Sequence, residues 1–247
     1  MNIKGGMDVE NDMKQPSAQE ELAYINQFTK SPLTAEEVYF FPVRLCDNEV
    51  DRDWERFSLE ALEGLRELFP GKTLLFDHER RSASQTARIY DTALETEPGK
   101  STQAGEVYTK LTAKAYLPRT EKNREVIELI ESGILKEVSV GCSVARHVCS
   151  ICGAEAGTCT HVKGRLYGEA LCFTELREPT DAYEWSFVAV PAQRAAGVVK
   201  QFQGEAPGDV VKRLEAAGEE GLSLTKAQAQ ALLAQVKQWQ EQARWGR

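Results

Sequence analysis

A dense group of metal-binding residue types occupies one short stretch of the chain, CSICGAEAGTCTH, which runs from residue 149 to 161. This stretch holds three of the six cysteines and one of the three histidines in the 247 residues. Cys149 and Cys152 have the C-x2-C spacing that lets two thiolates reach one ion, and Cys159 and His161 follow after a short loop. Three thiolates and one imidazole complete the tetrahedral shell of Zn2+ and leave no position for water, as in structural sites. We therefore predict that these four residues hold a structural Zn2+.

The sequence leaves alternatives to this metal site open. His147 is close enough along the chain to replace His161 as the fourth ligand, and without a metal the cysteines would be free or oxidised. Metal binding is favoured because clustered cysteines of a cytoplasmic protein bind metal more often than they form disulfides. Among the other cysteines, Cys142 lies on the apolar face of a predicted strand and Cys46 lies in another strand, so both are predicted to be buried thiols.

A closed zinc site does no chemistry itself, so catalytic groups must come from elsewhere in the chain. His78 ends the segment TLLFDH and precedes the loop ERRSASQT. A histidine at a strand end is suited to general-base chemistry, although a surface histidine with one hydrogen bond fits the same pattern. Ser139 lies between two valines, and Gly141 removes a side chain beside its hydroxyl, so that a substrate backbone can approach. An ordinary serine on a solvated face fits equally well, and spacing alone does not decide.

The composition argues against several classes of protein. The 30 Lys and Arg residues stand against 38 Asp and Glu, a formal net charge of −8, so the basic stripe needed for specific nucleic-acid binding is not expected. This also argues against a zinc-dependent nucleic-acid binder with a single knuckle. No apolar run reaches the length of a membrane span, and the polar N-terminus lacks the apolar core of a signal peptide. We therefore expect a protein that is made and used in a cytoplasm.

The elements that must position these residues are strands separated by single helices and long loops. Two amphipathic helices are predicted, SLEALEGLRELFPG (58–71) with Ser58 as its cap and RTEKNREVIELIESG (119–133) with Thr120 as its cap. The first helix carries a leucine stripe at 59, 62, 65 and 68. The predicted strands are VYFFPVRLC (38–46), KTLLFDH (72–78), EVYTKLTAKAYL (106–117), EVSVGCSV (137–144) and EWSFVAVP (184–191).

These elements predict an α+β fold with a mostly antiparallel, barrel-like sheet and flanking helices. Residues 1–30 are polar and aperiodic and are predicted to be a flexible tail. Residues 31–204 are predicted to form the main domain, in which 146–172 is the segment of the zinc knuckle. Beyond the linker QGEAPGD, residues 205–247 are predicted to be a helical appendage. Its narrow apolar stripe must pack on its own domain, on a second copy of the chain in a homo-oligomer, or on a scaffold protein.

Three segments, taken in order, resemble the prohead (capsid maturation) serine proteases of tailed bacteriophages, whose fold is similar to that of the herpesvirus assemblin proteases. They are LLFDHERRSASQTARI, with a histidine at a strand end, ESGILKEVSVGCSV, with Ser-hydrophobic-Gly in a strand, and DAYEWSFVAVPAQRAAGV, with an acidic residue, a strand and Pro-Ala. The resemblance covers about two-thirds of the chain, from residue 38 to residue 199. It implies His78 as the general base and Ser139 as the nucleophile of a serine endopeptidase.

Related proteases orient the catalytic histidine with a second histidine or an acid on a late strand. Because no histidine follows His161, the resemblance implies Glu184 as the orienting residue, with Asp181 as the second choice and an ordinary strand-edge carboxylate as the alternative. Asp77 is a poor orienter of His78, since neighbouring side chains of a strand point to opposite faces.

The resemblance also implies the setting in which the chain works. Its substrates would be the major capsid protein and the scaffold, and it would act in the host cytoplasm, inside the assembling procapsid. Two features depart from the family pattern: Cys142 replaces the usual aromatic residue after Ser-x-Gly, and the zinc knuckle is inserted directly after the nucleophile strand. The insertion leaves open the alternative of a non-catalytic structural or assembly protein of the phage capsid on the same fold.

Overall fold

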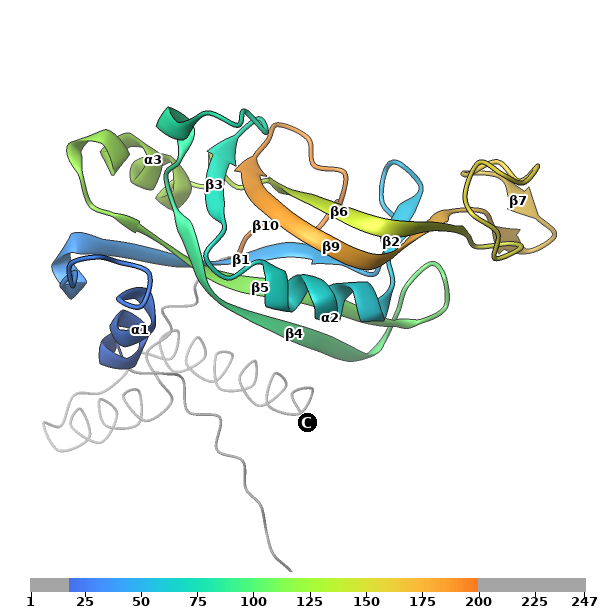
Figure 1. The fold of residues 1–247 in the computed structure, drawn as a ribbon, viewed down its shortest axis with the longest axis horizontal. Helices are drawn as coiled ribbons and strands as arrows, with labels where there is room; N and C mark the ends of the chain where they lie inside the picture. The colour runs from blue at the N-terminus through green and yellow to red at the C-terminus, as the bar shows by residue number, and fades with distance from the viewer. Residues whose placement is uncertain (1–17, 200–247) are drawn as a thin grey trace, which may run out of the picture. The chain divides into compact units, whose positions relative to one another are not determined.

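Residues 18–199 of this chain are described by a computed structural model. They form a mixed α+β unit with a mostly antiparallel sheet, three α-helices and two short 3-10 turns (Figure 1). The helical elements are α1 (Ala18–Ile25), η1 (Ala35–Glu37), α2 (Leu59–Leu68), η2 (Ser82–Ser84) and α3 (Glu121–Glu131). The strands are β1 (Val38–Asp47), β2 (Glu55–Phe57), β3 (Thr73–Phe76), β4 (Arg88–Ser101), β5 (Val107–Pro118), β6 (Val138–Cys149), β7 (Leu166–Tyr167), β8 (Ala170–Leu171), β9 (Thr174–Phe187) and β10 (Gly197–Val198).

The main sheet has eight strands, in the order β10-β1-β5-β4-β3-β9-β2, with β6 paired to β9. The long strand β9 is the organising member of the sheet. One of its edges pairs with β6 along nearly its whole length, and it also pairs in parallel with β2 at its start and with β3 at its end. Figure 1 shows β9 in orange between β3 and β6. Segments that are distant in sequence therefore meet along β9.

The predicted α+β class and mostly antiparallel sheet are confirmed, but within residues 18–199 the sheet does not close into a barrel. The segment just before β6 meets the edge strand β10 only through a short contact, which consists of the bridge between Glu137 and Gly197 and hydrogen bonds such as Val198 N to Lys136 O (2.8 Å). A barrel needs a continuous ladder around its circumference. Among the described residues, β6 pairs along its length only with β9, and its other edge has no partner strand beyond this contact. The sheet therefore stays open.

Helix α2 shows how the sequence specifies a local element and its packing. The Ser58 hydroxyl accepts a hydrogen bond from Ala61 N at 3.1 Å, which is the predicted N-cap. The leucine stripe is confirmed at Leu62 and Leu65, which are fully buried, but Leu59 in the first turn is 43% exposed. Gly64 allows close approach to the sheet, because a Cβ there would lie 2.5 Å from the Pro179 side chain of β9.

The core lies between the sheet and α2. It includes Leu62 and Leu65 of α2, Leu74 of β3 and Trp185 of β9, and α3 adds Ile127. Thr120 occupies the predicted N-cap position of α3, but its side chain makes no capping hydrogen bond. None of the helices in residues 18–199 has the length and apolar character needed to span a membrane.

The predicted flexible tail is wrong for residues 18–30, because α1 is docked on the sheet. Ile25 is 1% exposed and packs with Val38 and Tyr90 in a small second core. Glu21 accepts a hydrogen bond from the Tyr90 hydroxyl at 2.7 Å and forms an ion pair with Lys114 of β5. This short helix is stabilised by its contacts with the strands and not by a periodic apolar pattern of its own. The lack of periodicity in the sequence therefore does not indicate a flexible segment here. The remaining tail, 1–17, and the predicted appendage, 205–247, lie outside the described residues.

We predict that Ile25→Ala lowers the free energy of unfolding by about 2–4 kcal/mol, because it leaves a cavity in the small core. The neighbouring residue Tyr24 is 51% exposed, so Tyr24→Ala is the matched control and should change stability by no more than about 0.5 kcal/mol. Chemical denaturation of both variants measures the difference. Equal, small effects would show that α1 does not belong to the folded unit.

Candidate active site and candidate metal centre

The β6–β9 hairpin carries both groups of residues that the sequence singled out. At one end, Ser139 of β6 lies opposite Ser186 of β9, and at the other end Cys149 lies opposite Thr174. The loop between the two strands, residues 150–173, contains the rest of the cysteine cluster and the β7–β8 pair. Ten positions of strand separate Ser139 from Cys149, which at the rise of a β-strand is about 33 Å. The two groups are therefore separate sites on one structural element.

The turn after β3 presents His78 to the end of this hairpin. β3 stops at Phe76, and both Asp77 and His78 adopt the left-handed backbone region, with φ of 51° and 57°. Residues other than glycine seldom adopt this conformation, which costs about 1–3 kcal/mol and persists only where surrounding contacts hold it. The backbone N–H of Asp77 donates to Phe187 O at 3.0 Å, so β9 fixes the turn. A strained backbone that places a titratable side chain is a frequent feature of functional sites.

The imidazole of His78 meets a buried carboxylate on β9. His78 Nδ1 lies 2.8 Å from Glu184 Oε1, and the side chain of Glu184 is 3% exposed whereas that of His78 is 40% exposed. The predicted pairing of this histidine with Glu184, the first choice, is present in the structure. The second choice, Asp181, lies three residues before Glu184 in β9 and forms an ion pair with Lys72 at 3.4 Å instead. The carboxylate therefore binds Nδ1 of His78, and the rest of the ring is partly exposed to solvent.

Gly141 makes room for this carboxylate. It lies opposite Glu184 in the register of β6 and β9, and a Cβ at position 141 would be 2.0 Å from Glu184 Oε1. Any larger residue would push the carboxylate away from His78. The glycine of the Ser-x-Gly pattern thus serves the histidine–carboxylate pair, and not only the approach of a substrate backbone as the sequence suggested.

Ser139 shares a sheet face with the histidine–carboxylate pair. It is two residues from Gly141 and is paired with Ser186, and directly opposite residues of an antiparallel pair point to the same face. The predicted alternation of β6 is also confirmed, since Val138 and Val140 pack on the core side. Ser139 is half-buried and lies on the other side, so its hydroxyl is available on the face that carries His78.

Two neighbouring residues do not take part in this arrangement. Cys142 packs against the core, as predicted, and burial, together with the charge of Glu184, raises the pKa of its thiol to about 11, so it is not a thiolate nucleophile at neutral pH. Asp77 is exposed and precedes His78 in the turn. It does not hold the imidazole, although the reason is the turn conformation and not the alternation of a strand.

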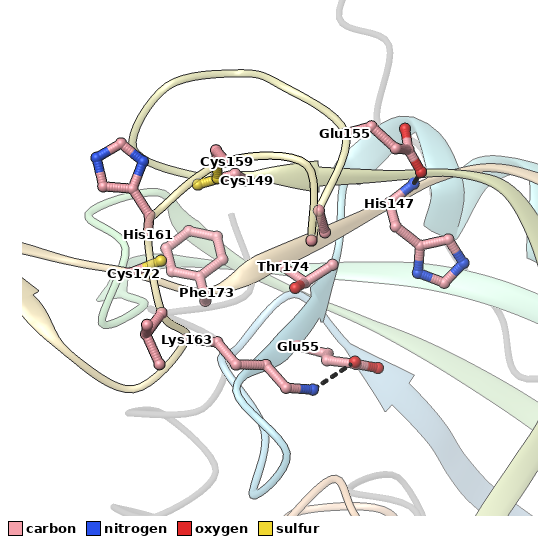
Figure 2. A pocket seen from close by; sticks show the side chains of 13 residues that line it. Glu55, His147, Cys149, Glu155, Cys159, His161, Lys163, Cys172, Phe173 and Thr174 are labelled. Carbon is pink, nitrogen blue, oxygen red and sulfur yellow. Dashed lines mark hydrogen bonds and ion pairs between the residues drawn. The ribbon is translucent and has the colours of Figure 1, made fainter.

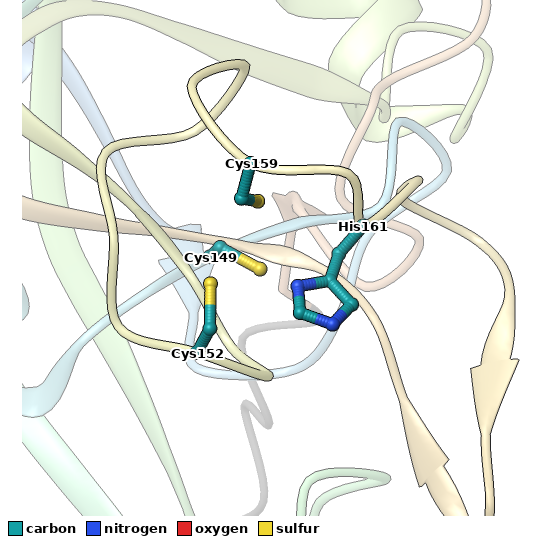
Figure 3. Close-up of side chains that lie close together, drawn as sticks. All are labelled: Cys149, Cys152, Cys159 and His161. Carbon is teal, nitrogen blue, oxygen red and sulfur yellow. The ribbon is translucent and has the colours of Figure 1, made fainter.

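The four predicted metal ligands converge at the other end of the hairpin. One ligand atom from each of Cys149, Cys152, Cys159 and His161 lies within 4.8 Å of all the others, so that these residues could bind a metal ion (Figure 3). His161 Nδ1 is buried and has no hydrogen-bond partner among the described residues, and its ring packs edge-on against Tyr167 with the centroids 4.6 Å apart. A buried ring nitrogen without a partner is what a coordinate bond to a metal would satisfy.

The thiols of this cluster differ in acidity. Desolvation raises the pKa of Cys149, but hydrogen bonds from the backbone N–H groups of Cys152 and Ile151 and from the neighbouring thiols outweigh it and lower the pKa to about 6. Desolvation and the nearby Cys149 raise the pKa of Cys172 to about 11. The thiolate is the form that binds metal ions. Cys149 is thus ready to coordinate, whereas Cys172 behaves as a buried thiol beside the cluster.

His147 is not part of the cluster. Figure 2 shows its ring across a pocket from Cys159 and His161, and the residue is exposed. The alternative in which it replaces His161 as the fourth ligand is therefore not supported by the geometry. The predicted start of the insertion also shifts, since residues 146–149 are still in β6 and pair with β9. The same pocket is bridged by Lys163 of the loop, whose Nζ lies 2.8 Å from Glu55 of β2.

A buried arginine that the sequence analysis did not identify anchors the base of the loop. Arg56 of β2 is 4% exposed, forms an ion pair with Glu175 at the start of β9, and lies 5.0 Å from the ring centroid of Phe173. Desolvation opposes ionisation of Glu175, but hydrogen bonds from Arg56 and Arg177 outweigh it and lower the pKa of this carboxyl. No local sequence pattern marks Arg56, because its partners come from distant strands.

Comparison of the chain with protein-family models, with curated proteins and with solved structures gives no match.

We predict that Gly141→Ala lowers the free energy of unfolding by about 1–3 kcal/mol, because the new methyl group overlaps the buried carboxylate of Glu184. In a Glu184→Ala background the overlap is absent, and the same glycine substitution should be close to neutral. Chemical denaturation of the four proteins in this double-mutant cycle gives the coupling energy. Additive effects would contradict the contact.

We also predict that the purified protein binds one metal ion per chain through the cluster. Cys152→Ser should abolish binding, because a tetrahedral site loses one of its four donors, whereas the matched control His147→Ala should retain full stoichiometry. Elemental analysis measures both. Chelation should increase hydrogen exchange in residues 150–173 before it affects the core strands. A stoichiometry near zero in the unmodified protein would refute the site.

Proposed function

We propose that this chain is a serine endopeptidase in which Ser139 is the nucleophile, His78 the general base and Glu184 the residue that orients the imidazole. The observation that supports this most strongly is the 2.8 Å contact between His78 Nδ1 and the buried carboxylate of Glu184. Ser139 lies on the same face of the β6–β9 hairpin. A nucleophile, a base and a third group that orients the base are the parts of a catalytic triad, which is recognised by geometry and not by fold.

The proposed reaction follows from these roles. Ser139 Oγ attacks the carbonyl carbon of a peptide bond while His78 Nε2 takes the hydroxyl proton, which gives a tetrahedral intermediate. His78 then donates this proton to the leaving amine as the C–N bond breaks, and an acyl-enzyme ester remains on Ser139. A water molecule, deprotonated by His78, hydrolyses the ester and restores the serine. The negative charge of Glu184 stabilises the imidazolium that forms in each half of the cycle.

The resemblance to the prohead proteases supports a narrower form of this proposal. The order of the histidine segment, the serine segment and the acidic strand in the sequence is the order of that family, and the structure brings residues of all three segments together. On this basis we propose that the substrates are the major capsid protein and scaffold of a tailed phage, cleaved within the assembling procapsid in the host cytoplasm.

We further propose that the metal is Zn2+ and that its role is structural. Three thiolates and one imidazole suit a borderline-soft ion in a closed tetrahedral shell. The cluster lies at the opposite end of the hairpin from Ser139, so it supplies no group to the proposed reaction. A metal clip offsets the entropic cost of ordering a loop of this length, and it would hold the ends of β6 and β9 together.

The alternative function, a non-catalytic assembly protein, has one observation in its favour. The knuckle exposes two apolar side chains, Val162 at 47% and Leu166 at 69%, which suits contact with another protein. The histidine–carboxylate pair has no role in this alternative. The activity of the intact chain therefore separates the two.

We predict that Ser139→Ala and His78→Ala each lower the rate of peptide cleavage by at least about a thousandfold without loss of fold, as for the loss of a triad member. Ser143→Ala is the matched control, because Ser143 lies on the same face of β6 and its hydroxyl instead contacts Thr180 at 2.7 Å. Cleavage of the cognate capsid precursor and labelling by a fluorophosphonate probe measure the effect.

Two results would contradict this assignment. Undiminished cleavage by Ser139→Ala would exclude this serine as the nucleophile. Absence of both labelling and cleavage in the unmodified chain, with its metal bound, would favour the assembly protein.

A further inference from the structure

Ser186 lies at the centre of the contact between β9 and the turn that carries His78. It is fully buried, and its hydroxyl donates a hydrogen bond to Glu184 Oε2 at 2.6 Å. The hydroxyl oxygen of Ser186 also accepts a hydrogen bond from the backbone N–H of His78 at 3.2 Å. Because Glu184 Oε1 contacts His78 Nδ1 at 2.8 Å, these three residues form a closed ring of hydrogen bonds that begins and ends at His78.

We propose that Ser186 is a positioning residue that fixes both the backbone and the tautomer of His78. Its catalytic meaning rests on the proposed peptidase function, but its effect on the imidazole does not. A serine hydroxyl has a single hydrogen, and here that hydrogen is directed to Glu184 Oε2. Oε1 is then the carboxylate oxygen that faces the ring. Since an ionised carboxylate only accepts, Nδ1 must be the donor, and the neutral imidazole keeps Nε2 free to take a proton.

The hydroxyl also opposes the unproductive arrangement. If Glu184 were protonated while Oε2 still accepted from Ser186, its proton would lie on Oε1 and would point at Nδ1. The imidazole would then carry its own hydrogen on Nε2 and could not act as a base toward Ser139. With the Ser186 hydrogen on Oε2 and the Nδ1 hydrogen on Oε1, both oxygens of Glu184 act as acceptors. Ser186 thus favours the state in which His78 is an acceptor at Nε2.

The backbone of the turn gives a second reason for a hydroxyl at this position. His78 adopts φ 57°, and its N–H is bonded to a side chain and not to a neighbouring strand. The preceding N–H, from Asp77, is held by Phe187 O at 3.0 Å. Ser186 therefore supplies the contact that holds His78 in a conformation residues with a Cβ seldom adopt. An alanine would leave both the N–H of His78 and Oε2 of Glu184 without this partner.

Nitrogen NMR of the full-length, metal-bound protein labelled with 15N-histidine tests the proposal. The chain has three histidines, and His147 and His161 serve as internal references. In the unmodified protein with a neutral His78 imidazole, we expect a protonated Nδ1 and an unprotonated Nε2. Ser186→Ala should give a mixture of tautomers at His78 while the other two histidines are unchanged. Ser186→Thr, which retains the hydroxyl, should restore the single tautomer.

Cleavage kinetics add the catalytic readout. We expect Ser186→Ala to lower kcat by about ten- to a hundredfold with little change in KM, since the lost interaction acts on the reaction and not on substrate binding. Ser143→Ala is the control that should leave both parameters unchanged. A single Nδ1-protonated tautomer in Ser186→Ala would overturn the proposal even if the protein is a peptidase. If the tautomers mix as expected but the unmodified chain cleaves nothing, the peptidase function fails and the positioning role stands.

Discussion

The pairing of β6 with β9 is the constraint on which both sites depend. Its register places Gly141 opposite Glu184 and Ser139 opposite Ser186, so that one face of the hairpin carries the serine and the carboxylate. The other face carries apolar residues such as Trp185, which belong to the core. A slip of one residue would exchange the two faces, which would bury the serine and expose the core. Packing of the apolar face therefore also fixes the geometry of the polar one.

Burial of the Glu184 carboxylate is an electrostatically unfavourable feature of this arrangement, because the group loses its contact with water. A carboxylate that is 3% exposed requires partners for its oxygens, and it finds them in His78 and Ser186. The four possible metal ligands lie at the far end of the same hairpin, where a bound ion would offset the entropic cost of ordering a long loop. Arg56 stabilises the base of that loop through Glu175 and Phe173. The proposed catalytic residues and the proposed metal brace thus lie at opposite ends of the hairpin.

Much of the fold was predictable wherever a segment carried its own signal. Alternation predicted β5 and the start of β6, and the cap at Ser58 with its leucine stripe predicted α2. The sequence analysis does not predict strand β4, because its sequence RIYDTALETEPGKS is largely polar and most of its residues after Tyr90 are exposed. The sequence analysis does not predict helix α1, because the segment has few apolar residues. Its burial depends on the contact of Ile25 with Val38 and Tyr90, which come from other parts of the chain. Closure of the sheet into a barrel is a property of long-range pairing, and no local pattern reports it.

The sequence by itself determined the residue types and their order: four metal-ligand types at a spacing that allows one shell, a histidine at a strand end, and a serine two residues before a glycine. Spacing of this kind is local, and the short loop could bring the four ligand atoms together without help from distant segments. Only the tertiary structure decided that Glu184 and not Asp181 contacts His78. It also decided that the missing side chain of Gly141 leaves space for that carboxylate and that the Ser186 hydroxyl donates to it. These contacts depend on which strands lie side by side and in which register, and register is set by packing of the opposite, apolar face.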